Sequence, residues 1–112
     1  MGQANATGPY ATAQPERSAI DATPGVVALE FGTDWCGHCR AAAPMIAAAL
    51  KAAPGVRHLK VEDGSARPLE RSFRVKLWPT LVVLKDGKEV ARIVRPADVQ
   101  EVSTALGLAE VG

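Results

Sequence analysis

The sequence predicts an α/β domain with a central mixed β-sheet of four to five strands and helices on both faces. Two observations carry this prediction. Strand-like and helix-like segments alternate from Val26 to Val61, and a right-handed crossover in such a unit makes the two strands parallel. Further on, Asp86-Gly87 separates two apolar runs, and a two-residue Asp-Gly turn pairs its strands antiparallel. Parallel and antiparallel pairs together define a mixed sheet.

The chain of 112 residues is long enough for one domain with a single core. Residues 1–14 show no apolar period, and we expect a flexible lead-in there. The single domain then spans residues 15–112. Its first element is a short helix from Pro15 to about Ala22, because proline is favoured at the start of a helix.

The first strand is predicted over Val26 to Phe31, where nearly every residue is apolar. Such a run indicates a strand in the centre of the sheet, buried on both faces. The next helix is predicted from Cys36 to Ala53, and Gly55 after Pro54 is expected to end it. A second strand follows over Val56 to Val61.

The second half of the domain is predicted to contain two strands between two helices. A short helix covers Pro68 to Phe73, and strands follow over Thr80 to Lys85 and Glu89 to Val94. The last helix is expected to start at Pro96 and to end at Gly107. Its buried stripe is predicted at three positions: Val99, Val102 and Leu106.

The composition favours a globular protein that binds neither nucleic acid nor membranes. The formal net charge is only +1, whereas nucleic-acid binders are typically strongly basic. No apolar run approaches the roughly 18 residues that a membrane helix needs. Residues 1–16 lack the regions of a secretory signal, so we expect a cytoplasmic monomer, or a periplasmic one if a leader had been removed.

The chemistry-bearing motif is Trp35-Cys36-Gly37-His38-Cys39, which contains the only two cysteines of the chain. It stands where the first long strand gives way to the first long helix. If Cys36 begins that helix, its sulfur faces unpaired backbone N–H groups and the positive end of the helix dipole. Both favour the thiolate, which is the reactive form in disulfide exchange.

Two other interpretations of the cysteine pair are weaker than redox chemistry. A permanent disulfide across so short a loop would contribute only about 2 kcal/mol on the chain-entropy model. A zinc site needs four ligands, and beyond the two thiols the chain offers only His38 and His58 as histidine ligands. We therefore expect no metal.

Four features together resemble the thioredoxin family. They are the Trp35-Cys36-Gly37-His38-Cys39 motif, Pro44, the Trp78-Pro79-Thr80 step and the Lys85-Asp86-Gly87 hairpin. The resemblance covers Val26 to Leu106 and implies the thioredoxin fold. It also implies a protein-disulfide oxidoreductase, acting as a reductase in a reducing cytosol and as an oxidase or isomerase if exported.

The resemblance further implies the partners and the roles of the main site residues. Partners would be protein disulfides and a reductase or other dithiol electron donor, with no cofactor beyond the Cys36–Cys39 redox-active disulfide. Cys36 would be the nucleophile and Cys39 the resolving thiol. Glu30 stands where the family carries a buried acid that could take the proton from Cys39, and Lys60 matches a lysine that approaches this acid.

The residues around the dithiol are implied to tune it and to bind substrate. With His38 between the cysteines, the motif resembles that of the disulfide isomerases. The imidazole should favour the Cys36 thiolate and so stabilise the reduced dithiol form. Trp35 and Gly37 complete the motif. The substrate groove would be built by four residues, with Pro79 in cis: Trp78, Pro79, Thr80 and Arg95.

Two positions depart from the family pattern and bear on partner choice. Arg95 stands where thioredoxins typically have a glycine, and Gly32 stands where they have an aromatic residue. An alternative function is a thioredoxin-fold adaptor whose groove holds an extended peptide and whose dithiol is incidental or regulatory. The presence of both cysteines with Glu30 and Lys60 favours the enzyme.

Overall fold

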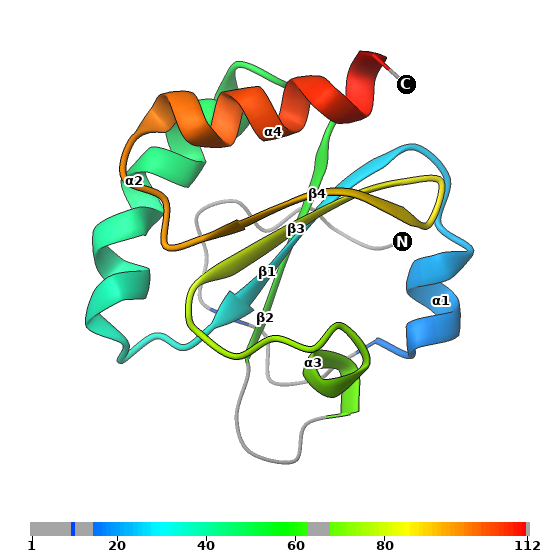
Figure 1. The fold of residues 1–112 in the computed structure, drawn as a ribbon, viewed down its shortest axis with the longest axis horizontal. Helices are drawn as coiled ribbons and strands as arrows, with labels where there is room; N and C mark the ends of the chain where they lie inside the picture. The colour runs from blue at the N-terminus through cyan, green and yellow to red at the C-terminus, as the bar shows by residue number, and fades with distance from the viewer. Residues whose placement is uncertain (1–9, 11–14, 63–67, 112) are drawn as a thin grey trace.

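The computed structural model describes residues 10, 15–62 and 68–111. Helices and strands alternate as predicted for the first half and are followed by a hairpin and a last helix (Figure 1). In chain order the elements are α1 (Arg17–Asp21), β1 (Val26–Gly32), α2 (Gly37–Lys51), β2 (Arg57–Glu62), α3 (Pro68–Ser72), β3 (Thr80–Lys85), β4 (Lys88–Val94) and α4 (Val99–Val111).

The described strands form one mixed sheet in the order β2-β1-β3-β4. β1 pairs with β2 in parallel and with β3 antiparallel, and β3 pairs with β4 antiparallel. The predicted mixed sheet and the central place of the first strand are confirmed. In the parallel pair Glu30 lies opposite Lys60 and Ala28 lies opposite His58, so these side chains share one face of the sheet.

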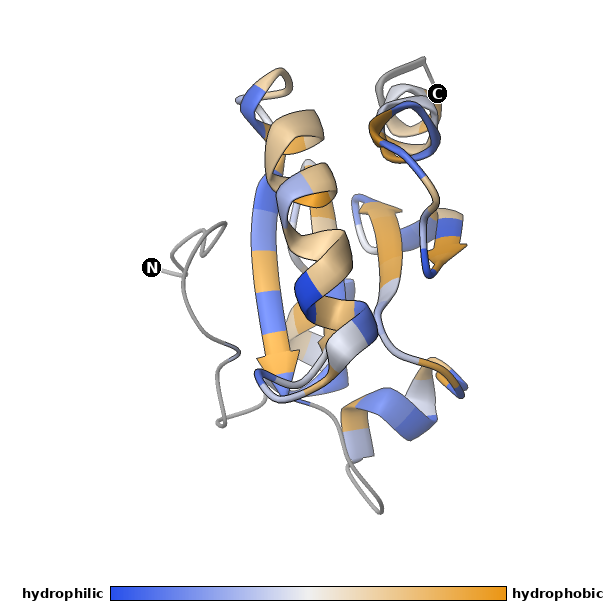
Figure 2. Ribbon diagram, turned by 90° about the vertical axis from the view of Figure 1, so that its left-hand side faces the viewer, coloured by the Kyte–Doolittle hydropathy of each residue, from blue (hydrophilic) through white to orange (hydrophobic). Residues whose placement is uncertain are grey.

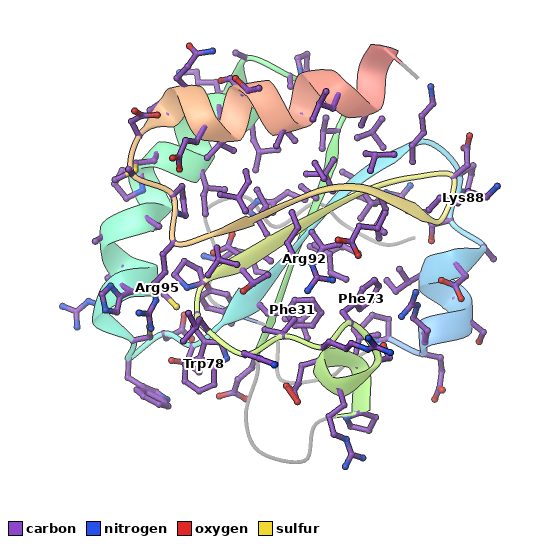
Figure 3. The ribbon with its side chains drawn as sticks, in the orientation of Figure 1. Phe31, Phe73, Trp78, Lys88, Arg92 and Arg95 are labelled. Atoms are coloured by element: carbon purple, nitrogen blue, oxygen red, sulfur yellow. The ribbon has the colours of Figure 1, made fainter. Side chains whose placement is uncertain are left out.

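Helices cover both faces of the sheet, as predicted. On one face the sheet is covered by α2 and α4 (Figure 1), and the core there includes Ala28, Leu81 and Val83. On the other face, the core includes Phe31 of β1 and Phe73 after α3, whose ring centroids lie 5.9 Å apart (Figure 3). Along the edge strand β2 polar and apolar residues alternate, as Figure 2 shows, whereas β3 is buried over nearly its whole length.

The Asp86-Gly87 turn joins β3 to β4, as the sequence predicts. Asp86 has φ 51° and Gly87 has φ 85°, and a hairpin turn with two positive φ angles matches the right-handed twist of its strands. A Cβ on Gly87 would lie 2.0 Å from the backbone oxygen of Asp21. The turn therefore requires glycine both for its conformation and for its contact with α1.

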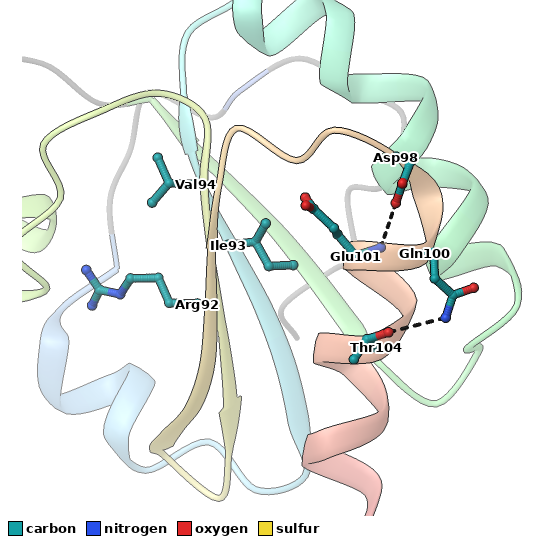
Figure 4. Close-up of a pocket in the computed structure, with 7 residues that line it drawn as sticks. All are labelled: Arg92, Ile93, Val94, Asp98, Gln100, Glu101 and Thr104. Atoms are coloured by element: carbon teal, nitrogen blue, oxygen red, sulfur yellow. Dashed lines mark hydrogen bonds between the residues drawn. The ribbon is translucent and has the colours of Figure 1, made fainter.

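The predicted bounds of the last helix were wrong at both ends. α4 begins at Val99, after Asp98, whose carboxylate accepts a hydrogen bond from the Glu101 N–H (3.0 Å; Figure 4). This N-cap satisfies one of the backbone donors that the first turn of a helix leaves unpaired, and it sets the start of α4 at Val99. Gly107 lies inside the helix, because the last turn buries Ala109 completely. Burial there outweighs a cost of about 1 kcal/mol for a glycine inside a helix.

The buried stripe of α4 is also shifted from its prediction. Val99 is 40% exposed, whereas Val102 and Leu106 are buried as expected and are joined by Ala105 and Ala109. Pro44 lies within α2 without ending it. The predicted lead-in over residues 1–14 lies outside the described residues except for Tyr10, which is buried.

Candidate active site

The site is built on the first turn of α2, where Cys36 is the N-cap residue. Its backbone is extended (φ −82°, ψ 123°), and its sulfur accepts a hydrogen bond from the Cys39 N–H at 3.3 Å. The Cys36 carbonyl accepts the first helical bond, from the Arg40 N–H at 3.0 Å. Sulfur at a helix N-cap is stabilised as an anion by the free N–H groups and the dipole. Cys36 is half-buried, so it remains open to a substrate.

Cys39, one turn further on, is buried at 2% exposure, and its sulfur lies next to Gly32 at the end of β1. The two cysteines are not bonded to each other, so the structure is of the dithiol form. Burial raises the pKa of Cys39 to about 11, and its hydrogen bond with Cys36 acts in the same direction. Cys39 therefore holds its proton near neutral pH and needs a base before it can attack a disulfide.

Glu30, in the middle of β1, is a buried carboxylate that interacts with His58 and Tyr10. Its Oε1 lies 2.7 Å from Nε2 of His58, and its Oε2 accepts a hydrogen bond from the Tyr10 hydroxyl. Glu30 and His58 are 1% and 2% exposed. Nδ1 of His58 finds no partner in the described part of the chain, which assigns the ring hydrogen to Nε2.

Tyr10 is the residue that the sequence analysis missed. Its backbone N–H donates to Asp34 Oδ1 (3.2 Å), its ring lies 4.5 Å from the Lys60 ammonium, and its hydroxyl interacts with Cys39 as well as with Glu30. Burial, together with Glu30, raises the pKa of Tyr10 far above its usual range. The signal was present in the sequence: Gly32 replaces a family aromatic, and Tyr10 is the only tyrosine of the chain.

The rim of the site is formed by two tryptophans and a cis peptide bond. Trp35 is 70% exposed, and its ring meets that of Trp78 edge to face with centroids 5.6 Å apart. The Trp78–Pro79 bond is cis, as the family resemblance implies. Pro79 itself is buried. Trp35 directly precedes the accessible thiol in sequence, and its contact with Trp78 forms an aromatic surface that offers apolar contact to a partner.

Arg95 forms hydrogen bonds to two backbone carbonyls of this rim. Its Nε donates to the Trp78 carbonyl at 2.8 Å, its backbone N–H donates to the Pro79 carbonyl at 3.0 Å, and its φ is 52° (Figure 3). Thr80 is buried, and its hydroxyl donates to the Leu77 carbonyl at 2.5 Å. The structure thus brings Arg95 and Trp78 together, while the Thr80 side chain supports the loop from inside.

The remaining predicted site residues lie in α2 and β2. Gly37 and His38 are exposed in the first turn of α2. Lys60 is 9% exposed and stands beside Glu30 in the sheet. His58, expected to be a packed or rim histidine, is buried against Glu30. Within residues 10, 15–62 and 68–111, no three His, Cys, Asp or Glu side chains gather as metal ligands.

Two hollows differ in their relation to the dithiol. A small cavity of about 70 Å³ is lined by Tyr10, Thr33, Asp34, Cys39, Arg40, Ala43 and Lys60. An open groove of about 530 Å³ lies between β4 and α4, and its lining contains none of the predicted site residues (Figure 4). Of these two hollows, only the small cavity borders the dithiol, through Cys39. Among the described helices, none is long and apolar enough to cross a membrane.

The fold and the site together define a thiol–disulfide oxidoreductase with the dithiol Cys36/Cys39. The family model described as Thioredoxin matches residues 11–107. Thioredoxin 2 from Pseudomonas aeruginosa PAO1, in its reduced form, is 50% identical in sequence; the match covers 95% of this chain and 99% of that one, with a TM-score of 0.83. The chain belongs to the thioredoxin family.

Curated relatives agree with this assignment. A thioredoxin from Chlamydia trachomatis serovar D is 41% identical over 80 residues, which are 70% of this chain and 78% of that protein. Thioredoxin H-type 1 from Nicotiana tabacum is 40% identical over 72 residues, which are 64% of this chain. The match spans 57% of the tobacco protein's length.

Proposed function

We propose that this protein reduces protein disulfides in two exchange steps. In the first step the Cys36 thiolate attacks one sulfur of the substrate disulfide. A mixed disulfide forms, and the other substrate sulfur leaves as a thiolate. In the second step Cys39 attacks the Cys36 sulfur, the Cys36–Cys39 bond forms, and the remaining substrate thiolate leaves. The dithiol loses two electrons and the substrate disulfide gains them.

The division of roles between the cysteines rests on their different surroundings. The observation that carries it is the N-cap hydrogen bond from the Cys39 N–H to the Cys36 sulfur, which stabilises a thiolate on the half-buried cysteine. Cys39 is buried, and its raised pKa keeps it protonated. Glu30, which lies opposite Lys60 in the sheet, is the proton acceptor that prepares Cys39 for the second step.

Lys60 and the aromatic rim have supporting roles in this proposal. Lys60 stands beside Glu30 and holds its ammonium over the Tyr10 ring, where a positive charge moderates the burial of the carboxylate. Trp35, Trp78 and Pro79 form the surface that an extended substrate segment contacts. Arg95 favours acidic segments there. His38 favours the thiolate of Cys36 from the first turn of α2.

The proposed substrates are protein disulfides, and the oxidised dithiol is recycled by a reductase or another dithiol donor. The proposed setting is the cytoplasm, where thiols are kept reduced. A monomer meets the needs of the mechanism, because every proposed role is filled from one chain.

Trapping the mixed disulfide tests the assignment of the two cysteines. A Cys39→Ser variant removes the second attack, so it should retain substrate proteins through a reducible bond to Cys36. Cys36→Ser is the matched control and should retain none. Non-reducing electrophoresis and peptide mass spectrometry locate the bond. Equal trapping by the two variants, or attachment through Cys39, would contradict the assignment.

A further inference from the structure

The Tyr10 hydroxyl lies between the two groups that must exchange a proton in the second step. It donates to Oε2 of Glu30 and also interacts with the Cys39 sulfur. Tyr10 comes from outside the strands and helices, yet it is only 7% exposed. A hydroxyl both accepts and donates a hydrogen bond, so this group has the chemistry of a relay.

Gly32 makes room for this arrangement. A Cβ at Gly32 would lie 2.6 Å from the Cys39 sulfur, 2.7 Å from the Tyr10 oxygen and 2.9 Å from Tyr10 Cζ. Any side chain at this position would displace the tyrosine or the resolving thiol. Glycine at position 32 is therefore what allows the Tyr10 side chain to be buried beside Cys39.

We infer that Tyr10 is the proton-relay residue between Cys39 and Glu30, an assignment that rests on the proposed roles of the two cysteines. The Cys39 S–H passes its proton to the Tyr10 oxygen while the Tyr10 O–H passes its own proton to Glu30 Oε2. Tyr10 ends as a neutral hydroxyl, Glu30 ends protonated, and the Cys39 thiolate attacks Cys36. The departing substrate thiolate or water then takes the proton from Glu30.

The groups around Tyr10 favour proton transfer from the Cys39 thiol to the Glu30 carboxylate. His58 donates from Nε2 to Glu30 Oε1, and so holds the other carboxylate oxygen in place. Lys60 covers the tyrosine ring with its ammonium. Asp34 and Arg40 line the small cavity beside Cys39, together with Lys60, so the pH dependence measured at Cys39 includes these neighbours.

Reaction with 5,5′-dithiobis(2-nitrobenzoate) at equimolar reagent separates the two steps in one stopped-flow trace. Attack by Cys36 releases the first coloured thiolate, and attack by Cys39 on the resulting mixed disulfide releases the second. Tyr10→Phe should leave the first phase within about twofold and slow the second by about tenfold or more at pH 7. The deficit should shrink as the pH approaches about 11, where Cys39 ionises without a base.

Two variants give the experiment its controls. Thr33→Val removes another buried hydroxyl from the wall of the same cavity, one without a hydrogen-bond partner among the described residues, and should leave both phases unchanged. The Tyr10→Phe/Glu30→Gln double variant should be no slower in the second phase than the slower single variant, because both residues act in one relay.

A fluorotyrosine at position 10 provides a test that keeps the hydroxyl and the packing. Tyr10 is the only tyrosine, so biosynthetic replacement of tyrosine changes this residue alone. The more acidic hydroxyl should move the pH profile of the second phase to lower pH. An unmoved profile, an unaffected second phase in Tyr10→Phe, equal slowing of both phases, or equal slowing by Thr33→Val would each overturn the relay. Retention of the first phase by Cys36→Ser would instead overturn the proposed cysteine roles.

Discussion

Glu30 and His58 form a buried pair across the parallel strands β1 and β2, with Oε1 and Nε2 separated by 2.7 Å. Both side chains are almost fully covered. A buried carboxylate must be stabilised by hydrogen-bond donors, because an unpaired buried charge costs several kcal/mol. The position of the proposed base is therefore set by a histidine as well as by the tyrosine.

Removing His58 should destabilise the protein. His58→Ala leaves Glu30 without one of its donors and opens a cavity, and we expect a loss of about 3 kcal/mol in the free energy of unfolding. His38→Ala is the matched control, because His38 is exposed, and should change stability by less than about 0.5 kcal/mol. Denaturant unfolding measures both. Equal effects of the two substitutions would contradict the structural role of His58.

The conformation of Arg95 predicts an order of stability for two substitutions. Both Arg95→Gly and Arg95→Ala lose the hydrogen bond to Trp78, but only glycine adopts φ 52° without a steric penalty. We expect the glycine variant to be more stable by about 1 kcal/mol in denaturant unfolding. An alanine variant as stable as the glycine variant would show that this backbone conformation is not retained.

The protonated state of Cys39 predicts a loss of stability at alkaline pH. Its pKa is raised from near 9 to about 11 in the folded protein, so the stabilisation is fully present below about pH 9. It is lost as the pH rises through about 11. Between about pH 9 and pH 11, the free energy of unfolding of the reduced protein should fall by about 2 kcal/mol more than that of a Cys39→Ala variant. The raised pKa of Tyr10 also lowers stability at alkaline pH, and it does so both in the wild type and in the Cys39→Ala variant. Parallel stability curves would contradict the prediction.

Replacing His38, which lies between the two cysteines, should shift the reduction potential of the dithiol. If His38 favours the thiolate and thereby the dithiol form, His38→Pro should lower the potential by about 30 mV, a tenfold change for a two-electron couple. Equilibration with glutathione buffers measures it. An unchanged or higher potential in the variant would remove His38 from the tuning of the dithiol.

Local patterns predicted most of the fold. Apolar runs, the Asp86-Gly87 turn and proline positions report on neighbours in sequence, and they identified the strands and their directions correctly. The bounds of α4 were wrong because a carboxylate cap at Asp98 and the burial of Ala109 outweighed the expected start at Pro96 and end at Gly107.

The site was predictable where a motif or the family resemblance pointed to it. The dithiol, Glu30 and the cis Trp78–Pro79 bond came from these sources. The contacts of Glu30 with Tyr10 and His58 did not, because Tyr10 lies 20 residues before it and His58 lies 28 residues after it. No periodicity links residues at such separations, and only the folded sheet brings them together.

Insulin disulfide reduction by dithiothreitol tests the central claim, that Cys36 is the attacking thiol of a working dithiol. The wild-type protein should accelerate the precipitation of the reduced insulin chains, and Cys36→Ser should not exceed the rate with dithiothreitol alone. Cys36→Ser acceleration equal to that of the wild type would contradict the account.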